Sequence, residues 1–260
     1  MSATIEFRRV CVATREKRLL LDNVSLALDE GTTTAILGRS GSGKTTLLRT
    51  VNRMIEPASG DVLVNGVNVR DLDSIQLRRG VGYVIQEAGL FPHFTVERNV
   101  GIVLEAMGRP LEERRERSRE LLTSVGLDPA TFSRRYPFQL SGGQRQRVSV
   151  ARALAADPGI LIMDEPFGAL DPLTRAEMQD MLRDLLARLR KTVLLVTHDL
   201  DEALYLADRI LLVKDGRVVA NLAREEFMQS RQPDVEAYVQ AYHRGEAKTL
   251  SAPASQEGQH

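Results

Sequence analysis

Residues 34–46 have the sequence TAILGRSGSGKTT, and this stretch decides the fold because a glycine-rich loop joins an apolar strand to a helix. Residues 34–37 are the predicted strand, and residues 45–53 are the predicted helical run. The loop between them is Gly38-Arg39-Ser40-Gly41-Ser42-Gly43-Lys44-Thr45-Thr46, which fits the pattern G-x-x-x-x-G-K-[ST].

A loop of this kind holds phosphate groups. Its glycines let backbone N–H groups turn inward around phosphate oxygens, and the following helix directs the positive end of its dipole at the same charge. We therefore expect Lys44 to reach the β- and γ-phosphates of a nucleotide and Thr45 to ligate Mg²⁺. The alternative is a glycine-rich turn that only connects a strand to a helix.

Other short β-branched runs alternate with helical patterns, which predicts an α/β fold with a mainly parallel sheet. The clearest strands are residues 34–37, 82–85, 160–163 and 193–197, and each leads into a residue assigned to the site. Ligands of such sheets lie beyond the carboxyl ends of the strands. Residues 5–12 and 19–28 predict strands of an antiparallel β section, with Glu30-Gly31 as a turn. Asn65-Gly66 and Asp215-Gly216 predict two further hairpins.

A helical lobe interrupts this pattern at about residues 91–158. Residues 111–127 are charged and helical, without a β signal, and residues 172–189 carry an apolar stripe that predicts a packed helix. We expect one domain over residues 1–243, with the lobe inserted in it. Residues 244–260 are small and polar without periodicity, and we expect them to be disordered.

The composition excludes several classes of protein. The chain has 260 residues with 35 Lys and Arg against 35 Asp and Glu, so no net field favours a nucleic-acid partner. The only cysteine is Cys11, which excludes an internal disulfide and suits the cytosol. No apolar run approaches the roughly 20 residues that cross a bilayer, so transport would require a pore from another chain.

Two carboxylates follow the apolar run of residues 160–163. Asp164 is expected to help hold Mg²⁺, and Glu165 to polarise an attacking water, as in P-loop NTPases. His198 and Gln86 follow two other predicted strands. An imidazole N–H can bond a γ-phosphate, and the amide of Gln86 can meet the metal or the water. Solvated acids at a strand end and a structural histidine are the alternatives.

A second candidate anion site begins at Leu140-Ser141-Gly142-Gly143-Gln144, where Ser141 is placed as the N-cap of a helix. The chain's own nucleotide belongs on the loop at Gly38. The second site is therefore available to the γ-phosphate of another molecule's ATP, which predicts a head-to-tail dimer with two bound nucleotides.

With these motifs in order, the chain resembles the ATPase subunits of ABC transporters over roughly residues 5–220. The segments that carry the resemblance are GRSGSGKTT, the glutamine of VIQEAGLFP, LSGGQRQRV, ILIMDEP, GALD and THD. The resemblance implies an ATP hydrolase in which residues 38–46 are Walker A, Gln86 is the Q-loop residue and a metal ligand, and Ser141, Gly142, Gly143 and Gln144 are the signature. It further implies that Asp164 is the Walker B acid, Glu165 the general base, Asp171 the D-loop residue and His198 the switch residue.

The chain departs from the family at the adenine site, where members usually stack an aromatic ring on the base. No aromatic residue lies between Phe7 and Tyr83. The expected position falls near residues 13–15, where the planar guanidinium of Arg15 could stack instead.

The sequences of the motifs are most similar to those of the ATPases of bacterial quaternary-amine importers. The segments concerned are RRGVGYVIQ (78–86), GLFPHFTV (89–96), RYP (135–137) and THDLDEAL (197–204). The resemblance implies import of glycine betaine, choline or similar osmoprotectants through an integral membrane permease, with a solute-binding protein as an indirect partner. It implies a peripheral place on the cytoplasmic face of the inner membrane and a second copy of the chain, or a similar subunit, as partner.

Three other interpretations stay open. Related importers of amino acids or nitrate share much of this wording. A soluble ABC ATPase that works on ribosomes or DNA usually has two ATPase units or long insertions. A nucleotide-binding module without hydrolysis would not need Glu165 and His198.

Overall fold

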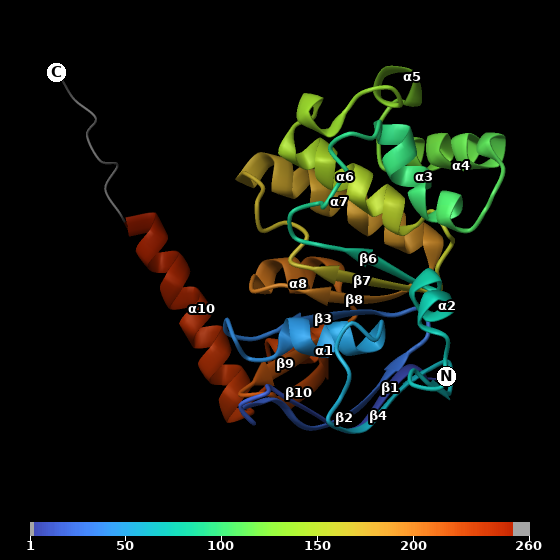
Figure 1. The fold of residues 1–260 in the computed structure, drawn as a ribbon. Coiled ribbons are helices and arrows are strands. Elements are labelled where there is room, and N and C mark those ends of the chain that lie inside the picture. Colours follow the sequence, from blue (N-terminus) through green and yellow to red (C-terminus); the bar gives the residue numbers. More distant parts are fainter. Residues whose placement is uncertain (1–2, 252–260) are drawn as a thin grey trace.

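Two β-sheets pack with helices in the computed structural model, which describes residues 3–251 (Figure 1). The strands are β1 (Ala3–Ala13), β2 (Leu19–Asp29), β3 (Thr33–Leu37), β4 (Ser59–Val64), β5 (Val67–Asn68), β6 (Val81–Val84), β7 (Ile160–Asp164), β8 (Thr192–Val196), β9 (Arg209–Lys214) and β10 (Arg217–Ala223). The helices are α1 (Lys44–Val51), α2 (Ser74–Arg79), α3 (Val96–Ala106), α4 (Leu111–Ser124), α5 (Pro129–Phe132), the 3₁₀ turn η1 (Pro137–Gln139), α6 (Gly142–Ala153), α7 (Pro172–Leu189), α8 (Leu200–Leu206), α9 (Arg224–Phe227) and α10 (Pro233–Ser251).

The larger sheet has the order β10-β9-β3-β8-β7-β6. Its neighbours pair in parallel except for the antiparallel hairpin β9–β10. Every residue of β3, β7 and β8 is buried, as expected of parallel strands with both faces covered. Because β3, β6, β7 and β8 run in one direction, the segments that follow them meet at one edge of the sheet. The predicted parallel strands are thus confirmed, with small differences at their ends.

The smaller sheet is antiparallel, with the order β2-β1-β4-β5. The β4–β5 hairpin turns at Asn65 and Gly66, whose φ angles are 51° and 78°. Positive φ at both central residues is the geometry that Asn-Gly favours in a two-residue hairpin. The antiparallel section predicted from the sequence is confirmed.

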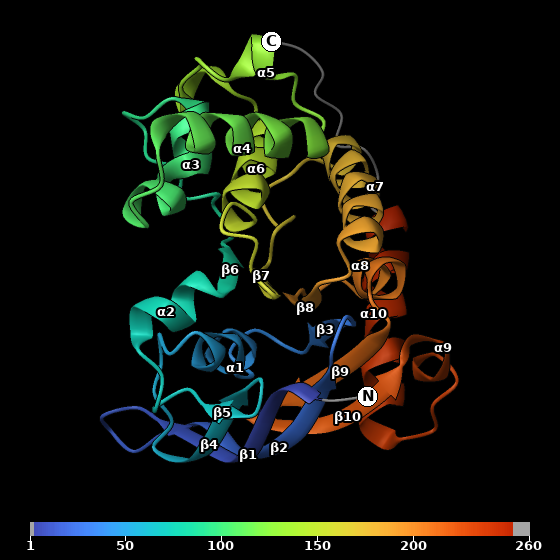
Figure 2. The same ribbon diagram turned by 90° about the vertical axis from the view of Figure 1, so that its right-hand side faces the viewer.

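Helix α1 lies between the two sheets (Figure 2). Its buried residues Leu47, Leu48 and Val51 share one core with apolar residues of β1, β2 and β4 and with Ile160 and Ile162 of β7. The opposite face of β7, formed by Leu161 and Met163, packs in a second core with α3, α4, α6 and α7. The alternation of side chains along one strand therefore places α1 and α6 on opposite faces of the larger sheet.

The predicted helical lobe consists of α3, α4, α5, η1 and α6, all of which fall between residues 96 and 153. The apolar stripe predicted in residues 172–189 is confirmed as packing, since Met178, Leu182 and Leu185 of α7 are buried in the core that α7 shares with the lobe.

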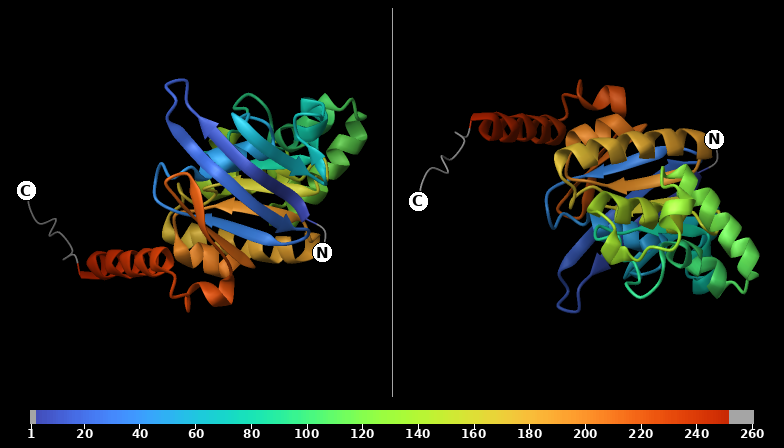
Figure 3. Two further views of the ribbon diagram at one scale, coloured as in Figure 1. Left: turned by 90° about the horizontal axis from the view of Figure 1, so that it is seen from below. Right: turned by 90° about the horizontal axis from the view of Figure 1, so that it is seen from above.

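Helix α10 leaves the body on the side away from α4, as both views of Figure 3 show. The sequence predicts disorder from Arg244 onward, and residues 244–251 of this stretch are described as the last turns of α10. Residues 246–250 include Glu, Ala, Lys and Leu, which have high helix propensity. The helix can therefore extend beyond its first turns, where apolar residues recur at helical spacing. The rest of the predicted tail, residues 252–260, lies outside the described residues. No helix in residues 3–251 combines the length and apolar character needed to cross a bilayer.

Candidate functional site

The phosphate loop, residues 38–46, connects β3 to α1 and is fixed by close backbone approaches. A Cβ atom on Gly38 would lie 2.2 Å from the carbonyl oxygen of Val213, and one on Gly43 would lie 2.6 Å from that of Leu20. Gly43 also has φ 107° at the N-cap of α1. Only glycine fits these two positions without displacing β9 or β2. The loop is therefore held between the two sheets, with the N-terminus of α1 behind it.

Lys44 is buried in this loop, with 6% of its surface exposed. Its Nζ donates hydrogen bonds to the carbonyl oxygens of Gly38 at 2.8 Å and Arg39 at 3.0 Å. Burial lowers the pKa of Lys44, and the negative charges of Glu165 and Asp164 oppose this shift. Because the charged ammonium is costly here, an anion placed in the loop would stabilise it.

A hydrogen bond between a hydroxyl and a carboxylate joins α1 to the end of β7. The Thr45 hydroxyl donates to Oδ1 of Asp164 at 2.8 Å. Within residues 3–251 no group of three His, Cys, Asp or Glu side chains could hold a metal ion. Mg²⁺ is usually bound by one or two protein oxygen ligands together with phosphates and waters. The Thr45–Asp164 pair beside a phosphate loop fits that donor set.

Arg49 and Tyr83 complete the surroundings of Asp164, and neither is predicted from the sequence. An Arg49 guanidinium nitrogen lies 3.5 Å from Oδ2 of Asp164, and the Tyr83 hydroxyl donates to the same oxygen at 3.4 Å. Nε of Arg49 donates to the Tyr83 hydroxyl at 3.2 Å. Burial raises the pKa of Tyr83, which keeps its hydroxyl protonated. Arg49 is detectable in the sequence as the residue one helical turn after Thr45; Tyr83 depends on the register between β6 and β7.

Glu165 follows Asp164 in a left-handed backbone conformation, with φ 47°. A non-glycine residue in this region is uncommon and costs energy, of order 1 kcal/mol or more. The conformation is held by the Glu165 N–H, which donates to the Val196 carbonyl of β8 at 3.0 Å. It brings Oε2 of Glu165 to 3.5 Å from Nδ1 of His198, whose side chain is 66% exposed. The strained backbone of Glu165 thus directs its carboxylate toward His198.

Gln86 lies close to the same carboxylate. A Cβ atom on Gly168 would be 3.2 Å from Nε2 of Gln86 and 3.7 Å from Oε2 of Glu165, so the bare glycine leaves space for both side chains. The buried Gln146 of α6 donates to the carbonyl of Ile85 at 3.3 Å. This contact connects the helix after Ser141 to the segment that carries Gln86. Gln146 is not predicted as a site residue from the sequence.

Ser141 caps the N-terminus of α6 as predicted. Its hydroxyl accepts from the Gln144 N–H at 3.2 Å, and the Gln144 amide oxygen accepts from the Ser141 N–H at 3.0 Å. A Cβ atom on Gly143 would lie 2.3 Å from the Thr174 side chain of α7, whereas Ser141 and Gly142 are exposed. In the part of the chain that the structure describes, no hydrogen bond or ion pair joins these residues to the phosphate loop.

Asp171 caps α7, and its carboxylate accepts from the Thr174 N–H at 3.1 Å. Hydrogen bonding to Thr174 lowers the pKa of Asp171. The sequence predicts that Gln86, Asp164, Glu165, His198 and the phosphate loop lie at one edge of the sheet, and the structure brings them together there. The residues at the start of α6 lie apart from this group.

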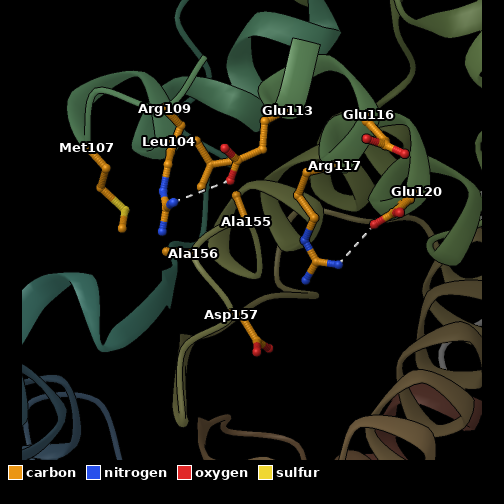
Figure 4. A pocket seen from close by; sticks show the side chains of 10 residues that line it. All are labelled: Leu104, Met107, Arg109, Glu113, Glu116, Arg117, Glu120, Ala155, Ala156 and Asp157. Carbon is orange, nitrogen blue, oxygen red and sulfur yellow. Dashed lines mark hydrogen bonds and ion pairs between the residues drawn. The ribbon is translucent and has the colours of Figure 1, made fainter. Parts of the chain in front are cut away.

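A separate cavity of about 300 Å³ lies in the lobe between α3, α4 and the end of α6 (Figure 4). Its charged side chains face one another: Arg109 lies 3.7 Å from Glu113, and Arg117 lies 3.2 Å from Glu120. None of the predicted site residues lines this cavity. Its lining has four acidic and two basic side chains, a balance that does not favour a polyphosphate.

Residues 21–168 match the family model described as ABC transporter. The chain is 49% identical over 208 residues to the osmoprotectant import ATP-binding protein OsmV of Salmonella typhimurium, covering 80% of this chain and 54% of that protein. It is 44% identical over 234 residues to the choline transport ATP-binding protein OpuBA of Bacillus subtilis, covering 83% and 61%. The chain thus spans less than two thirds of the length of these relatives.

Among solved structures, the fold is similar to a dimeric post-hydrolysis state of the ATP-binding cassette MJ0796 bound to ADP and Pi. The TM-score is 0.75 at 36% identity, and the match covers 85% of this chain and 98% of that one.

Proposed function

This chain belongs to the ABC transporter family, and we propose that it is an ATP-hydrolysing subunit that drives the import of a small solute through a separate permease. The observation that carries the proposal is the meeting of two pairs at one sheet edge beside the phosphate loop. These pairs are Thr45 with Asp164 at 2.8 Å and Glu165 with His198 at 3.5 Å. The first pair suits a metal-bound triphosphate, and the second suits a water aligned against its terminal phosphate.

In the proposed reaction, the triphosphate of ATP lies in the phosphate loop against Lys44. Thr45 and Asp164, with Gln86, would hold Mg²⁺, which supplies charge neutralisation for the phosphates. Glu165 accepts a proton from water as the water oxygen bonds to the γ-phosphorus and the bond to the β-phosphate oxygen breaks. The products are ADP and inorganic phosphate. His198 is placed to donate a hydrogen bond to the γ-phosphate while it faces Glu165.

A second copy of the chain, or a similar subunit, is part of this proposal. The start of α6, Ser141 to Gln144, offers helix N–H groups to an anion, and within residues 3–251 it forms no hydrogen bond or ion pair with the phosphate loop. ATP bound between the loop of one subunit and the α6 N-terminus of the other would satisfy both, with Asp171 near the shared boundary. The similar cassette MJ0796 was solved as a dimer with ADP and Pi.

The permease is proposed to dock beside Gln86. Phe91 is 43% exposed, and its ring centroid lies 5.3 Å from that of Phe94. Asn99 fixes this segment, since its side chain accepts from the Phe91 N–H at 2.7 Å and donates to the Phe91 and Phe94 carbonyls at 3.1 Å. A rigid, partly exposed aromatic surface next to Gln86 suits a short cytoplasmic helix of the permease, and it would place the chain on the cytoplasmic face of the inner membrane.

For the solute we propose a quaternary amine such as glycine betaine or choline, delivered by a solute-binding protein. The names of the relatives, which describe osmoprotectant and choline transport, support this choice. Amino-acid or nitrate import is the alternative.

Phosphate release from Mg-ATP by the purified chain tests the enzymatic part. Lys44→Ala should abolish release, because the loop loses its only buried cation. Lys191→Ala is the matched control, since Lys191 pairs with Asp157 at 2.8 Å just before the amino end of β8, away from the site. Equal loss in both variants, or no release by the unaltered chain, would refute the proposal.

Uptake tests the transport part. Proteoliposomes that contain a candidate permease, with this chain facing the lumen and the binding protein outside, should accumulate labelled glycine betaine only when ATP is enclosed in the lumen. Accumulation of nitrate or an amino acid, but not of glycine betaine or choline, would select the alternative solute.

A further inference from the structure

One face of α10 packs against the elements that carry the active-site edge. Val235, Tyr238, Val239 and Tyr242 follow the spacing i, i+3, i+4, i+7 and form this face. They contact the core formed by Leu37 of β3, residues of α8 and β9, and Phe227. The N-terminal part of the helix is further tied by Asp234, whose carboxylate lies 2.6 Å from Nζ of Lys214. The start of α10 is therefore firmly attached to the body.

The two tyrosines of this face reach the segment between β8 and α8, which carries His198. The Tyr238 hydroxyl donates to the backbone carbonyl oxygen of His198 at 3.3 Å. The Tyr242 hydroxyl lies between two carboxylates, 3.1 Å from Oδ1 of Asp199 and 3.0 Å from Oδ2 of Asp201. Tyr238 and Tyr242 lie one helical turn apart. Together they bond to the segment just before α8 and to the first turn of α8.

Both hydroxyls keep their protons at neutral pH. Burial, with the negative charge of Asp199, raises the pKa of Tyr238 to about 12, and a hydrogen bond with the backbone of Gly38 opposes this rise. Burial also raises the pKa of Tyr242. The tyrosines are therefore permanent donors, and Tyr238 lies between His198 and the first residue of the phosphate loop.

The imidazole of His198 has little support of its own. Its side chain is 66% exposed and faces Glu165 at 3.5 Å. Its neighbours are well fixed: the Asp199 N–H donates to the Thr197 hydroxyl at 3.0 Å, and Oδ1 of Asp199 accepts from the Asp201 N–H at 2.9 Å. The direction of an exposed ring with few contacts is set by the backbone that carries it.

We propose that Tyr238 and Tyr242 are positioning residues, which hold the His198 backbone so that the imidazole faces Glu165 and the γ-phosphate. This inference rests on the proposed function of His198. It makes α10 a part of the catalytic arrangement through the backbone that carries His198.

Tyr238→Phe and Tyr242→Phe in the full chain test the proposal, because phenylalanine keeps the packing and removes only the hydroxyl. Loss of one positioning hydrogen bond should lower kcat about fivefold, with KM for ATP within about twofold. Tyr205→Phe is the matched control. Its hydroxyl bonds to Asp180 and Arg183 on α7, on the exposed side of α8, and its loss should leave both constants unchanged.

A second readout does not depend on catalysis. The chain has four histidines, so the proton NMR signal of the His198 ring can be assigned by its absence in His198→Ala. Both tyrosine variants should shift or broaden this signal and leave that of His93 unchanged. If the unaltered chain releases no phosphate, the proposed function fails, while the ring signal still reports whether α10 holds His198.

Three results would overturn the inference: an unmoved His198 signal in both variants, an unchanged kcat in both, or an equal fall in Tyr205→Phe. Should one tyrosine variant fail to fold, the other gives the same decision by itself.

Discussion

Replacement of Glu165 by glutamine should separate ATP binding from ATP hydrolysis. Glutamine has the shape of glutamate, so the left-handed backbone at φ 47° and the bond from its N–H to Val196 should remain. The substitution removes the proton acceptor that faces His198 at 3.5 Å. A positioned general base contributes about 10²- to 10⁴-fold to a rate, which corresponds to roughly 2.7–5.5 kcal/mol of barrier. We therefore expect phosphate release to fall at least about 100-fold.

Binding should persist in this variant, since the phosphate loop and the Thr45–Asp164 pair are untouched. Loss of the carboxylate charge also removes a repulsion from the triphosphate, so the Kd for Mg-ATP should stay the same or decrease. The assay is steady-state phosphate release together with ATP binding by equilibrium dialysis, and sedimentation with ATP to detect the expected dimer. Glu177→Gln is the control, because Glu177 is an exposed carboxylate of α7. Phosphate release within a few-fold of the unaltered chain would refute the assignment of Glu165 as base.

Further substitutions probe other parts of the site. Gly43→Ala should abolish ATP binding in a dialysis assay, because its Cβ would lie 2.6 Å from the Leu20 carbonyl. Gly41→Ala meets no atom within 4 Å and adds only the strain of a side chain at φ 77°, so it should retain weakened but measurable binding. Lys44→Met should raise the melting temperature of the nucleotide-free chain while abolishing binding. Burial lowers the pKa of Lys44, so the protonated form is disfavoured in the folded state; its cost is present at pH 7 and declines only as the pH rises toward the unfolded pKa. The expected gain is about 0.5–2 kcal/mol, and a lower melting temperature would contradict it. Arg15→Ala should raise the KM for ATP about fivefold if its guanidinium stacks on adenine, with Lys17→Ala, in the same exposed turn, as control.

The sequence predicts the site best where function depends on the end of a strand. The phosphate loop, Asp164, Glu165 and His198 each follow a short apolar run, and parallel strands bring such ends to one edge of a sheet. The family resemblance, which rests on the same motifs, is confirmed by the family match over residues 21–168. Local patterns are sufficient here because the proposed chemistry and the fold use the same residues.

Contacts that depend on register or on distant packing were missed. Tyr83 reaches Asp164 only because β6 pairs with β7 so that Tyr83 lies beside Ile162. Tyr238 and Tyr242 reach the His198 segment from a helix about 40 residues later in the chain. An apolar face at helical spacing predicts that α10 packs on something, but not which element receives it.

The separation between the start of α6 and the phosphate loop is the physical argument for a two-subunit site. The strand β7 sends Ile160 and Ile162 toward α1 and Leu161 and Met163 toward α6, so the sheet separates the two helices. Each helix begins with exposed or loop-held N–H groups suited to an anion, and within residues 3–251 no hydrogen bond or ion pair joins the start of α6 to the phosphate loop. A second chain, related by a two-fold axis, can bring its own α6 to the first chain's phosphate loop and receive the same in return. We infer that the proposed site needs a partner subunit, because the start of α6 in one chain is not joined to the phosphate loop of that same chain.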